Sequence, residues 1–295
     1  MIFGDLVVGL AIGSAYALLA VAVVLVYSGT KVLSLAVGEI GAFSLYAALY
    51  WHDHGLPLVG WHPSVAAAGG IAVVGGGLLG LAIERVVMRP LVSRPPLDSL
   101  VATLAVALFL ALLELAIYGI DPFAAPSPVG QGSVKIFGST LTMTEIALFV
   151  LAVAVAVGLY LFLARTAFGL ATRATTSDPV VARLLGVKVN QVYVFTWGVA
   201  GLLSGAAASL LAPVIGSLTP FSLTTALLSA LAGAIIGGLD SLGGAILGSM
   251  AVGLVNGVVG SRVDPTTSAA VIFAAVLLTL LFRPQGIFGS SRAAA

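Results

Sequence analysis

The sequence predicts an all-α protein that crosses a membrane many times. Of its 295 residues, 60% are hydrophobic and 8% are charged, whereas soluble domains carry about 25% charged residues. So few charges cannot cover the surface of a water-soluble fold. Apolar runs of about 18 to 22 residues recur along the chain, and each is long enough to cross a hydrocarbon core of about 30 Å as a helix. These observations favour a polytopic α-helical membrane protein.

Nine apolar runs are candidate transmembrane helices, so we expect about eight or nine spans. They cover residues 6–27, 33–50, 64–83, 100–119, 143–164, 193–212, 223–238, 243–260 and 267–283. No Lys or Arg precedes the first run and it is full length, which favours a retained span over a signal peptide. The polar intervals between runs are short, so we expect residues 1–295 to form a single transmembrane domain.

The runs at 223–238 and 243–260 are short and flank the glycine-rich sequence GGLDSLGG. They form either a full hairpin or a pair of half-helices that enter the membrane and return. Pairs of glycines four residues apart recur within the runs, and this spacing lets helices approach closely. The pairs are Gly9/Gly13, Gly76/Gly80, Gly201/Gly205, Gly233/Gly237, Gly244/Gly248 and Gly253/Gly257.

The distribution of cations predicts the orientation, because cytoplasmic loops of membrane proteins carry an excess of Lys and Arg. With the N-terminus outside and the C-terminus in the cytoplasm, only Lys135 and Arg262 lie outside. The cytoplasmic cations are then Lys31, Arg85, Arg89, Arg94, Arg165, Arg173, Arg183, Lys188, Arg283 and Arg292. The outer side holds the loops WHDHGLPLVGWHP and DPFAAPSPVGQGSVKIFGST.

Composition and motifs also exclude several classes of protein. The formal net charge is +1 and no basic run contains interleaved aromatic residues, so we expect no nucleic-acid partner. The absence of cysteine excludes disulfides, thiol nucleophiles and thiolate metal sites. The chain also lacks a Gly-x-x-x-x-Gly-Lys-[Ser/Thr] phosphate loop, so any ATP-driven process needs another polypeptide.

Residues 174–189, ATTSDPVVARLLGVKV, have the features of a short surface helix between two apolar runs. Asp178 is a helix N-cap, Pro179 suits the first helical position and Gly186 suits the terminating position. The predicted helix covers 179–185, about two turns, and a helix this short is not stable alone in water.

One side of this predicted helix is apolar and needs a surface on which to dock. The apolar strip consists of Val181, Leu184 and Leu185, while Arg183 lies on another side. The residues alone leave three partners open: the lipid of the membrane surface, the protein's own helices, or a cytoplasmic protein.

Several segments resemble the permease subunits of branched-chain amino acid ABC importers. RATTSDPVVARLLGVKVNQVYVFTWGVAGLLSGAAASLLAP resembles that family's cytoplasmic loop and the span that follows it. GLAIGSAYALLAVAVVLVYSGTKVLSLAVGEIGAFSLY is similar to the first two spans of the family, and ERVVMRPL is similar to one of its cytoplasmic segments. GAIIGGLDSLGGAILGSMAVGLVNGVV and LLFRPQGIFG are similar to its C-terminal end. Together these segments are distributed along most of the chain, in the family's order.

The resemblance implies a permease of the bacterial cytoplasmic (inner) membrane that imports branched-chain or similar small amino acids. Such a permease has no enzyme site or cofactor of its own. It dimerises with a second permease, identical or paralogous, over two ATP-binding subunits that hydrolyse the ATP. An extracytoplasmic binding protein delivers its substrate.

The resemblance also implies that a cytoplasmic loop at about 165–192 holds a coupling helix that sits in a groove of the ATPase. Its coupling residues are Asp178 and Pro179 at the start, Val181, Leu184 and Leu185 on the docking face, Arg183 as a candidate for an ion pair, and Gly186 at the end. ATP-driven closure of the two ATPases would then move the membrane helices between outward-open and inward-open states.

The segment SLAVGEIG keeps Gly38 and Glu39 of the family's pattern but departs from it at Ser34, Leu35 and Val37. If this segment contacts the translocation path, substrate preference differs from that for branched-chain amino acids. Urea and short amides, which similar permeases carry, are then the alternative substrates.

Four residues are candidates for the translocation path: Ser14, Tyr16, Gly38 and Glu39. Glu39 has two interpretations, as a path-lining residue or as an interface carboxylate paired with Lys31. We favour the ion pair, because acids near the ends of spans are less costly than acids at the midplane.

Two other acids lie deeper in the predicted spans. Glu114 is expected to face a polar interior of the bundle, and Asp240 is expected to cap the second short helix or to lie in a cytoplasmic turn. Neither comes with the second acid, His or Lys that a proton relay would need.

The histidines share one outer loop, which makes His52, His54 and His62 weak candidates for a metal site. We expect no metal, because loops of this kind with Trp51 and Trp61 are common interfacial anchors.

Two classes compete with an ABC permease. A gradient-driven secondary carrier would use a midplane carboxylate in a broken helix, for which Asp240 is the candidate. An intramembrane enzyme would need a nucleophile with a base, or a metal with an acid, within the spans, and none is apparent in the sequence.

Overall fold

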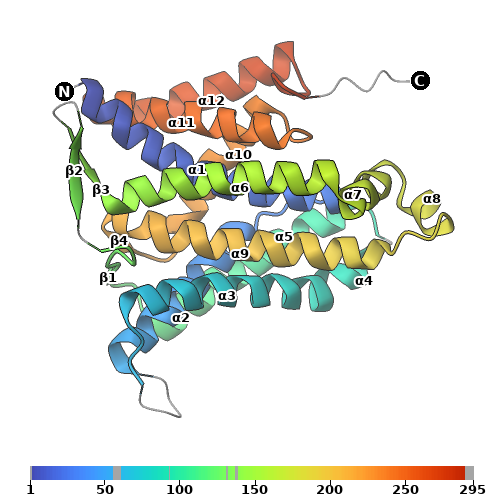
Figure 1. Ribbon diagram of the computed structural model, residues 1–295, viewed down its shortest axis with the longest axis horizontal. Coiled ribbons are helices and arrows are strands. Elements are labelled where there is room, and N and C mark those ends of the chain that lie inside the picture. The colour runs from blue at the N-terminus through green and yellow to red at the C-terminus, as the bar shows by residue number, and fades with distance from the viewer. Residues whose placement is uncertain (1, 56–60, 93, 131, 137–138, 290–295) are drawn as a thin grey trace.

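A computed structural model describes residues 2–55, 61–92, 94–130, 132–136 and 139–289. The long helices lie side by side in one bundle (Figure 1). They are α1 (Ile2–Thr30), α2 (Val37–His54), α3 (Val65–Ile83), α5 (Pro96–Tyr118), α6 (Met143–Arg165), α9 (Val189–Ile215), α10 (Ser222–Gly237), α11 (Leu242–Arg262) and α12 (Pro265–Phe282). The π-helical turn η1 (Glu84–Met88) and the short α4 (Arg89–Leu91) extend α3.

Short elements mark the two ends of the bundle. At one end, here called the hairpin end, β2 (Ser133–Ile136) pairs with β3 (Ser139–Thr142), and β1 (Phe123–Ala124) pairs with β4 (Ser217–Leu218), both antiparallel. At the opposite end, here called the α8 end, lie α7 (Ala167–Ser177) and α8 (Pro179–Leu184) (Figure 1).

Each of the nine predicted runs corresponds to a helix, which confirms the all-α polytopic fold class. Within the described residues, seven helices are long and apolar enough to cross a membrane. The prediction of about eight or nine transmembrane helices, with a possible discontinuous pair among them, is met by these seven together with two further apolar helices. The two remaining runs form α2 and α10, and neither qualifies as a complete span.

α2 begins in the interior of the bundle because the chain before it is not helical. Residues 31–36 form no helix or strand, and the carbonyl of Val37 accepts a hydrogen bond from the hydroxyl of Ser204. Ser204 lies near the middle of α9. The first turn of α2 is therefore level with the centre of a full-length span.

α10 begins at the same level. A Cβ atom at Gly38, in the first turn of α2, would lie 2.9 Å from the carbonyl oxygen of Leu223, in the first turn of α10. β4 leads into α10 and pairs with β1, with Phe123 opposite Leu218. The N-terminal ends of α2 and α10 thus meet inside the bundle.

The runs at 223–260, expected as a hairpin or as a pair of half-helices, form a helical hairpin in which α10 and α11 pack together but differ in length. α10 is short, with 16 residues, but α11 has 21 residues and is long enough to span. The other helix that begins inside the bundle is α2. Its apolar run at 33–50 gives no sign in the sequence of the non-helical residues at its start. Hydropathy alone does not distinguish helical from non-helical backbone within a mainly apolar run.

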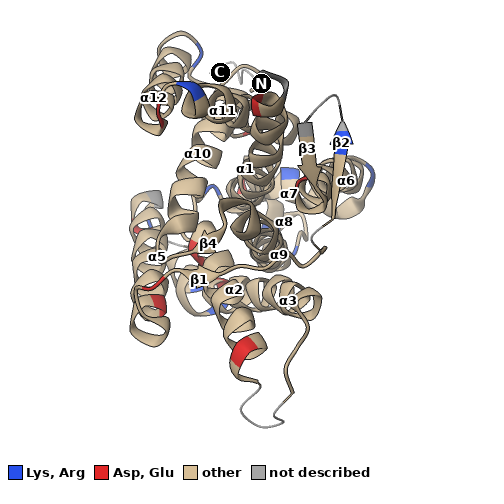
Figure 2. Ribbon diagram, turned by 90° about the vertical axis from the view of Figure 1, so that its left-hand side faces the viewer, with Lys and Arg blue, Asp and Glu red and all other residues tan. Residues whose placement is uncertain are grey.

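Glycine contacts hold the central helices close together. α1 packs against α11 through Gly9 and Gly13 on one side and Gly253 and Gly257 on the other, and a Cβ at Gly253 would overlap the backbone of Gly13. Seen from the hairpin end, α1 lies between α11 and α9 (Figure 2). The glycine spacing therefore predicted real close approaches.

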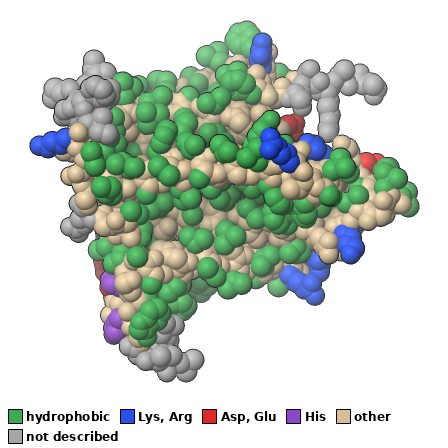
Figure 3. All heavy atoms as spheres, viewed as in Figure 1, with side chains coloured by type: hydrophobic (Ala, Val, Ile, Leu, Met, Phe, Trp, Pro, Cys, Tyr) green, Lys and Arg blue, Asp and Glu red, His purple; other side chains and the backbone are tan. Residues whose placement is uncertain are grey.

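The outer surface is apolar along the helices and charged at the ends. Large hydrophobic side chains are exposed on α5, α6 and α12, including Phe109 (62% exposed) and Leu281 (75% exposed). Figure 3 shows hydrophobic side chains spread over the face of the bundle, with most of the visible Lys and Arg near the α8 end. Such a distribution suits a bundle surrounded by lipid. Arg292 lies outside the described residues.

Candidate functional site

α8 is a short helix whose start is fixed by a side-chain cap. Asp178 Oδ1 accepts hydrogen bonds from the backbone N–H groups of Val180 (2.7 Å) and Val181 (3.0 Å). Pro179 occupies the first helical position, where its missing N–H costs nothing. The helix ends at Leu184, one residue earlier than predicted, and Gly186 adopts the left-handed region with φ of +84°. The predicted start and stop residues thus act as expected.

One side of α8 is attached to the rest of the protein. Ala182 is buried and packs with Val189 and Tyr193 of α9 in a small separate cluster. α7 leads into α8 and is tied to α1, because the hydroxyl of Thr176 donates to the carbonyl of Ser28. Movement of α8 would therefore be transmitted to α1 and α9.

The predicted apolar strip of α8 is not covered by any part of the chain that the structure describes. Val181 is 49% exposed, Leu184 83% and Leu185 76%. Val180, which sequence reasoning missed, is also 61% exposed. Val180 lies four residues before Leu184, and this spacing places both side chains on the same face of a helix. Arg183 is exposed and makes no ion pair with any described residue.

A second group of candidate residues lies at the junction of α2 and α10. Glu39, in the first turn of α2, is 1% exposed and accepts a hydrogen bond from the hydroxyl of Thr224 in α10. Because both helix N-termini carry partial positive charge, they favour a carboxylate at this position. Thr224 could not be linked to Glu39 from the sequence, since 185 residues separate them.

The favoured ion pair between Lys31 and Glu39 is wrong. The ammonium of Lys31 lies 3.2 Å from a carboxylate oxygen of Asp240, in the turn between α10 and α11. The non-helical segment 31–36 carries the chain from the α8 end to the middle of the bundle, which separates Lys31 from Glu39. Asp240 lies in a turn as expected, and the cap of α11 is Ser241, whose hydroxyl accepts from Gly244 N–H.

Glu114 faces the bundle interior, as expected, but the expectation that no second acid accompanies it is wrong, because it belongs to the same group as Glu39. It is fully buried, and neither of its carboxylate oxygens has a hydrogen-bond partner among the described residues. Tyr118, one turn further along α5, stacks on Tyr46 of α2 with ring centroids 5.2 Å apart. Glu39 and Tyr46 lie two turns apart on the same face of α2. Glu114 is therefore placed along α5 at the level between them.

This junction contains several polar atoms without protein partners. They are one carboxylate oxygen of Glu39, both carboxylate oxygens of Glu114 and the hydroxyl of Tyr46. Buried polar groups are normally hydrogen-bonded, so unpaired ones invite a functional explanation. Sequence reasoning missed Tyr46, although its spacing of seven residues from Glu39 places both on one helix face.

The remaining candidate path residues are only partly brought together. Gly38 contacts α10 beside Glu39. The hydroxyl of Ser14 donates to the carbonyl of Leu10 within its own helix (2.7 Å), and the hydroxyl of Tyr16 accepts from the side-chain amide of Asn256 in α11 (3.1 Å). Ser14 and Tyr16 are therefore placed in the packing of α1 and make no hydrogen bond to Glu39.

The histidines bond to backbone carbonyls near the end of α2. The Nδ1 atom of His52 lies 2.6 Å from the carbonyl oxygen of Pro63, and that of His62 lies 3.1 Å from the carbonyl oxygen of His52. His54 Nδ1 contacts the carbonyl of Tyr50. In the described part of the chain, no group of three or more His, Asp or Glu side chains could hold a metal ion. Residues 56–60 of this loop lie outside the described residues.

Comparison with known protein families and with individual proteins gives the same family. Residues 6–281 match the family described as branched-chain amino acid transport system / permease component. The chain is 31% identical over 293 residues to the high-affinity branched-chain amino acid transport system permease protein BraD of Pseudomonas aeruginosa, covering 97% of this chain and 95% of that protein. It is 28% identical to the permease protein LivH of Escherichia coli, over 95% of this chain and 93% of that protein.

A solved structure has a similar fold. The structure of PsaBC from Streptococcus pneumoniae in complex with Fab contains a chain that aligns with a TM-score of 0.52 over 96% of this chain and 91% of that chain. The two sequences are 14% identical. At this identity the similarity supports the arrangement of the helices alone.

Proposed function

The chain belongs to the family of branched-chain amino acid transport permease components, and on this premise we propose that it carries small amino acids into the cell through an ABC importer. Branched-chain amino acids are the substrates named for BraD and LivH. The chain lies in the cytoplasmic (inner) membrane of a bacterium. It has no catalytic site or cofactor of its own, and ATP is hydrolysed by separate ATP-binding subunits.

The observation that carries this proposal is the uncovered apolar surface of α8. A capped helix with Leu184 and Leu185 mostly exposed, yet anchored through Ala182 to α9, is built to hold a partner. We assign that partner as the ATP-binding subunit, with Arg183 available for an ion pair. Residues 165–192 then form the coupling loop, and closure of the ATPases moves α8 and, through it, α1 and α9.

The assignment of α8 to the ATPase sets the orientation. The α8 end becomes the cytoplasmic end, where most cations lie, in agreement with the excess of Lys and Arg on that side of membrane proteins. The N-terminus then lies outside and the described end of the chain, at 289, lies in the cytoplasm. The extracytoplasmic binding protein docks at the hairpin end, and a second permease subunit, identical or paralogous, completes the pathway.

The junction of α2 and α10 is the proposed translocation site. Helices interrupted within a bundle commonly mark transport sites, because their free N-terminal ends and unpaired polar groups can face a solute. Glu39 and Glu114 offer carboxylates to the ammonium group of an amino acid, and Gly38 lets α10 approach α2 closely. An unpaired buried acid is costly unless a cation or a proton accompanies it.

Cysteine cross-linking tests the coupling assignment, since the chain has no cysteine. In a complex with its ATP-binding subunits, Leu184→Cys is expected to cross-link to a cysteine in the ATPase groove, to an extent that changes with ATP. Ala182→Cys is the matched control on the same helix, because its side chain is 1% exposed and faces α9. Equal cross-linking from both positions, or none from Leu184→Cys in an active importer, would contradict the assignment.

One observation favours a second candidate, a gradient-driven carrier. The two buried carboxylates of Glu39 and Glu114 could bind a driving proton or sodium ion in the interrupted helices. The two functions separate in whole cells. Uptake that stops on ATP depletion with the membrane gradient maintained supports the ABC importer, whereas uptake that persists without ATP and stops with an uncoupler supports the carrier.

A further inference from the structure

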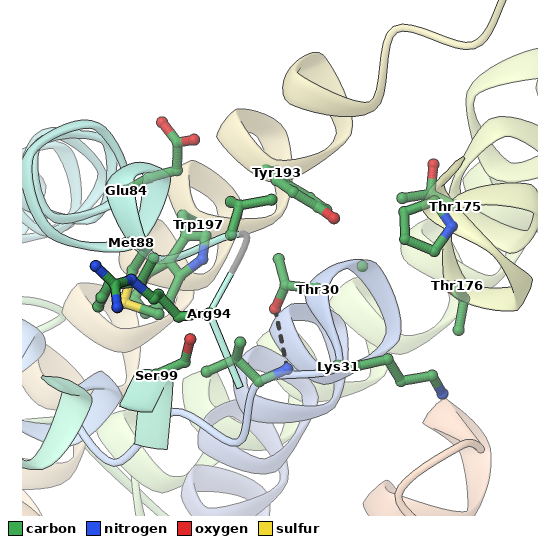
Figure 4. A pocket seen from close by; sticks show the side chains of 15 residues that line it. Thr30, Lys31, Glu84, Met88, Arg94, Ser99, Thr175, Thr176, Tyr193 and Trp197 are labelled. Carbon is green, nitrogen blue, oxygen red and sulfur yellow. Dashed lines mark hydrogen bonds between the residues drawn. The ribbon is translucent and has the colours of Figure 1, made fainter. Parts of the chain in front are cut away.

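A cavity of about 150 Å³ lies at the α8 end, apart from the junction of α2 and α10. Its walls come from segments that are distant in sequence (Figure 4). Met88, Arg94 and Trp197 lie on one side, and Thr175 and Thr176 of α7 lie on the other. The end of α1 lies between them. Pro179, at the beginning of α8, also lines the cavity. A cavity of this volume can hold a molecule the size of benzene.

The cavity presents hydrogen-bond donors that lack partners. Trp197 is 1% exposed, and its indole N–H has no hydrogen-bond acceptor among the described residues. In Figure 4 the indole nitrogen lies on the side of the ring that faces Thr30. Leaving a buried donor unpaired is unfavourable, so an acceptor placed in the cavity would be stabilised.

The charge of the cavity points to an anionic group. Arg94 lines the wall and makes no ion pair with a described residue, whereas Lys31 is already paired with Asp240. The acid on the wall, Glu84, has one carboxylate oxygen 3.6 Å from Arg89, and its other oxygen has no partner among the described residues. That oxygen is the acceptor that the lining offers to an ammonium group. The guanidinium of Arg94 is exposed and lies on the same wall as the unpaired indole N–H of Trp197. A carboxylate in the cavity can accept from these donors, and arginine binds carboxylates through two parallel hydrogen bonds.

The rest of the lining is suited to an aliphatic group. Val32, Met88 and Leu91 line the cavity together with the ring of Tyr193. Methionine adapts its shape to irregular apolar groups. A small carboxylate with a branched aliphatic side chain would therefore satisfy the polar and apolar parts of this cavity together.

We propose that this cavity binds a free amino acid with an aliphatic side chain from the cytoplasmic side and that its occupancy slows the transport cycle. The inference rests on the proposed function, since it takes α8 as the coupling helix. Thr176 and Pro179 of the coupling segment form one wall, and Thr30 and Lys31 at the end of α1 form another. A ligand in contact with both walls stabilises the arrangement seen here over any arrangement in which α8 has moved away from α1. The imported amino acid would thus limit its own uptake.

Equilibrium binding tests the site directly. Tritiated L-leucine is added to the purified complex of permease and ATP-binding subunits, without binding protein and without ATP. Arg94→Gln is expected to weaken binding at least about tenfold, because a hydrogen bond to a charged group is lost. Trp197→Phe keeps the ring but loses the N–H and should weaken binding as well. Arg85→Gln is the matched control, since Arg85 is exposed on η1 and does not line the cavity.

Transport tests the regulatory part. Proteoliposomes enclose the binding protein with labelled leucine, and ATP outside selects complexes whose ATPases face outward. Unlabelled leucine added outside, on the ATPase side, is expected to slow ATP-driven transport by the wild type and by Arg85→Gln. The rate of Arg94→Gln is compared with its own rate without added leucine. We expect this variant to need a leucine concentration at least about tenfold higher for the same slowing.

The outcomes separate this inference from the proposed function. Absence of ATP-driven transport, or absence of cross-links from α8, contradicts the proposed function. ATP-driven transport that external leucine does not slow, or slows equally in Arg94→Gln, contradicts only the cavity proposal. A third outcome would also overturn the proposal. If leucine binding is lost when phosphatidylglycerol replaces neutral lipid, and the lipid slows chemical modification of Arg94 by phenylglyoxal, the cavity belongs to a lipid headgroup.

Discussion

Glu39 occupies a position where the backbone and the side chains around it act on the same charge. The N-terminal ends of α2 and α10 stabilise a carboxylate there, and the hydroxyl of Thr224 bonds to one of its oxygens. The other oxygen has no partner among the described residues, and the buried carboxyl of Glu114 also lacks one. A passing ammonium group would fill the place that no protein group fills.

Replacing Glu39 with glutamine separates charge from packing. Glu39→Gln keeps an oxygen that can accept from Thr224 and nearly the same volume, so the junction should still fold. We expect the initial rate of amino acid uptake to fall at least about tenfold, because a charged hydrogen bond is worth about 1.5–3 kcal/mol. Asp53→Asn, an exposed acid on the same helix, is the control and should retain wild-type uptake. Wild-type uptake by Glu39→Gln would reduce Glu39 to a structural role.

At the scale of single residues, the sequence predicted local chemistry well and long-range neighbours poorly. Asp178, Pro179 and Gly186 act as cap, first residue and stop, because each of these roles depends on the nearest few residues. The partner of Lys31 was assigned wrongly, since the true partner Asp240 is 209 residues away. Trp197 was missed as a donor because nothing local shows that its N–H lacks an acceptor.

α8 depends on its cap more than a longer helix would. It has six residues, so the two N–H groups bound by Asp178 are a large part of its backbone hydrogen bonding. Loss of an N-cap commonly costs about 1 kcal/mol, and a short helix has few other interactions to offset that cost.

Asp178→Ala should therefore loosen α8, whereas Asp178→Asn, which can still accept these hydrogen bonds, should not. We expect faster hydrogen exchange at the amides of Val180 and Val181 in Asp178→Ala only. Transport per ATP hydrolysed should also fall in Asp178→Ala, because a frayed helix transmits less movement to α1 and α9. Unchanged exchange in Asp178→Ala would show that docking on α9 through Ala182 is enough to hold the helix.

The contact between α1 and α11 leaves no room for side chains at its glycines. Gly253→Ala adds a Cβ atom that would overlap the backbone of Gly13, and overpacking of this kind costs about 1–3 kcal/mol. Gly158→Ala is the control, because a Cβ at Gly158 in α6 meets nothing within 4 Å and alanine suits a helix better than glycine. Thermal unfolding in detergent should show a lower Tm for Gly253→Ala and no loss for Gly158→Ala.

For the helices, hydropathy predicted where along the chain they occur, but not at which level of the bundle each one begins. The run at 33–50 contains a non-helical segment and then α2, and hydropathy does not mark the boundary between them. The junction exists because the backbone groups freed there find other partners: Val37 with Ser204, and β4 with β1. These partners lie far along the chain, so only the folded arrangement reveals the interrupted helices.

The whole molecule divides into an apolar belt and two polar ends of different composition. Lys135 lies in β2 at the hairpin end, while Lys188 lies beside α8 at the start of α9. Both side chains are exposed. The proposed orientation puts them on opposite sides of the membrane.

Labelling with a membrane-impermeant maleimide tests that orientation. Because the chain has no cysteine, Lys135→Cys and Lys188→Cys each carry one reactive thiol. In cells whose outer membrane has been removed, we expect Lys135→Cys to be labelled and Lys188→Cys to remain unlabelled until the inner membrane is opened. Labelling of Lys188→Cys in intact cells would place α8 outside, where no ATP-binding subunit could reach it. The coupling assignment, the direction of transport and the cytoplasmic entry to the cavity beside Trp197 would then fall together, because all three depend on which end of the bundle faces the cytoplasm.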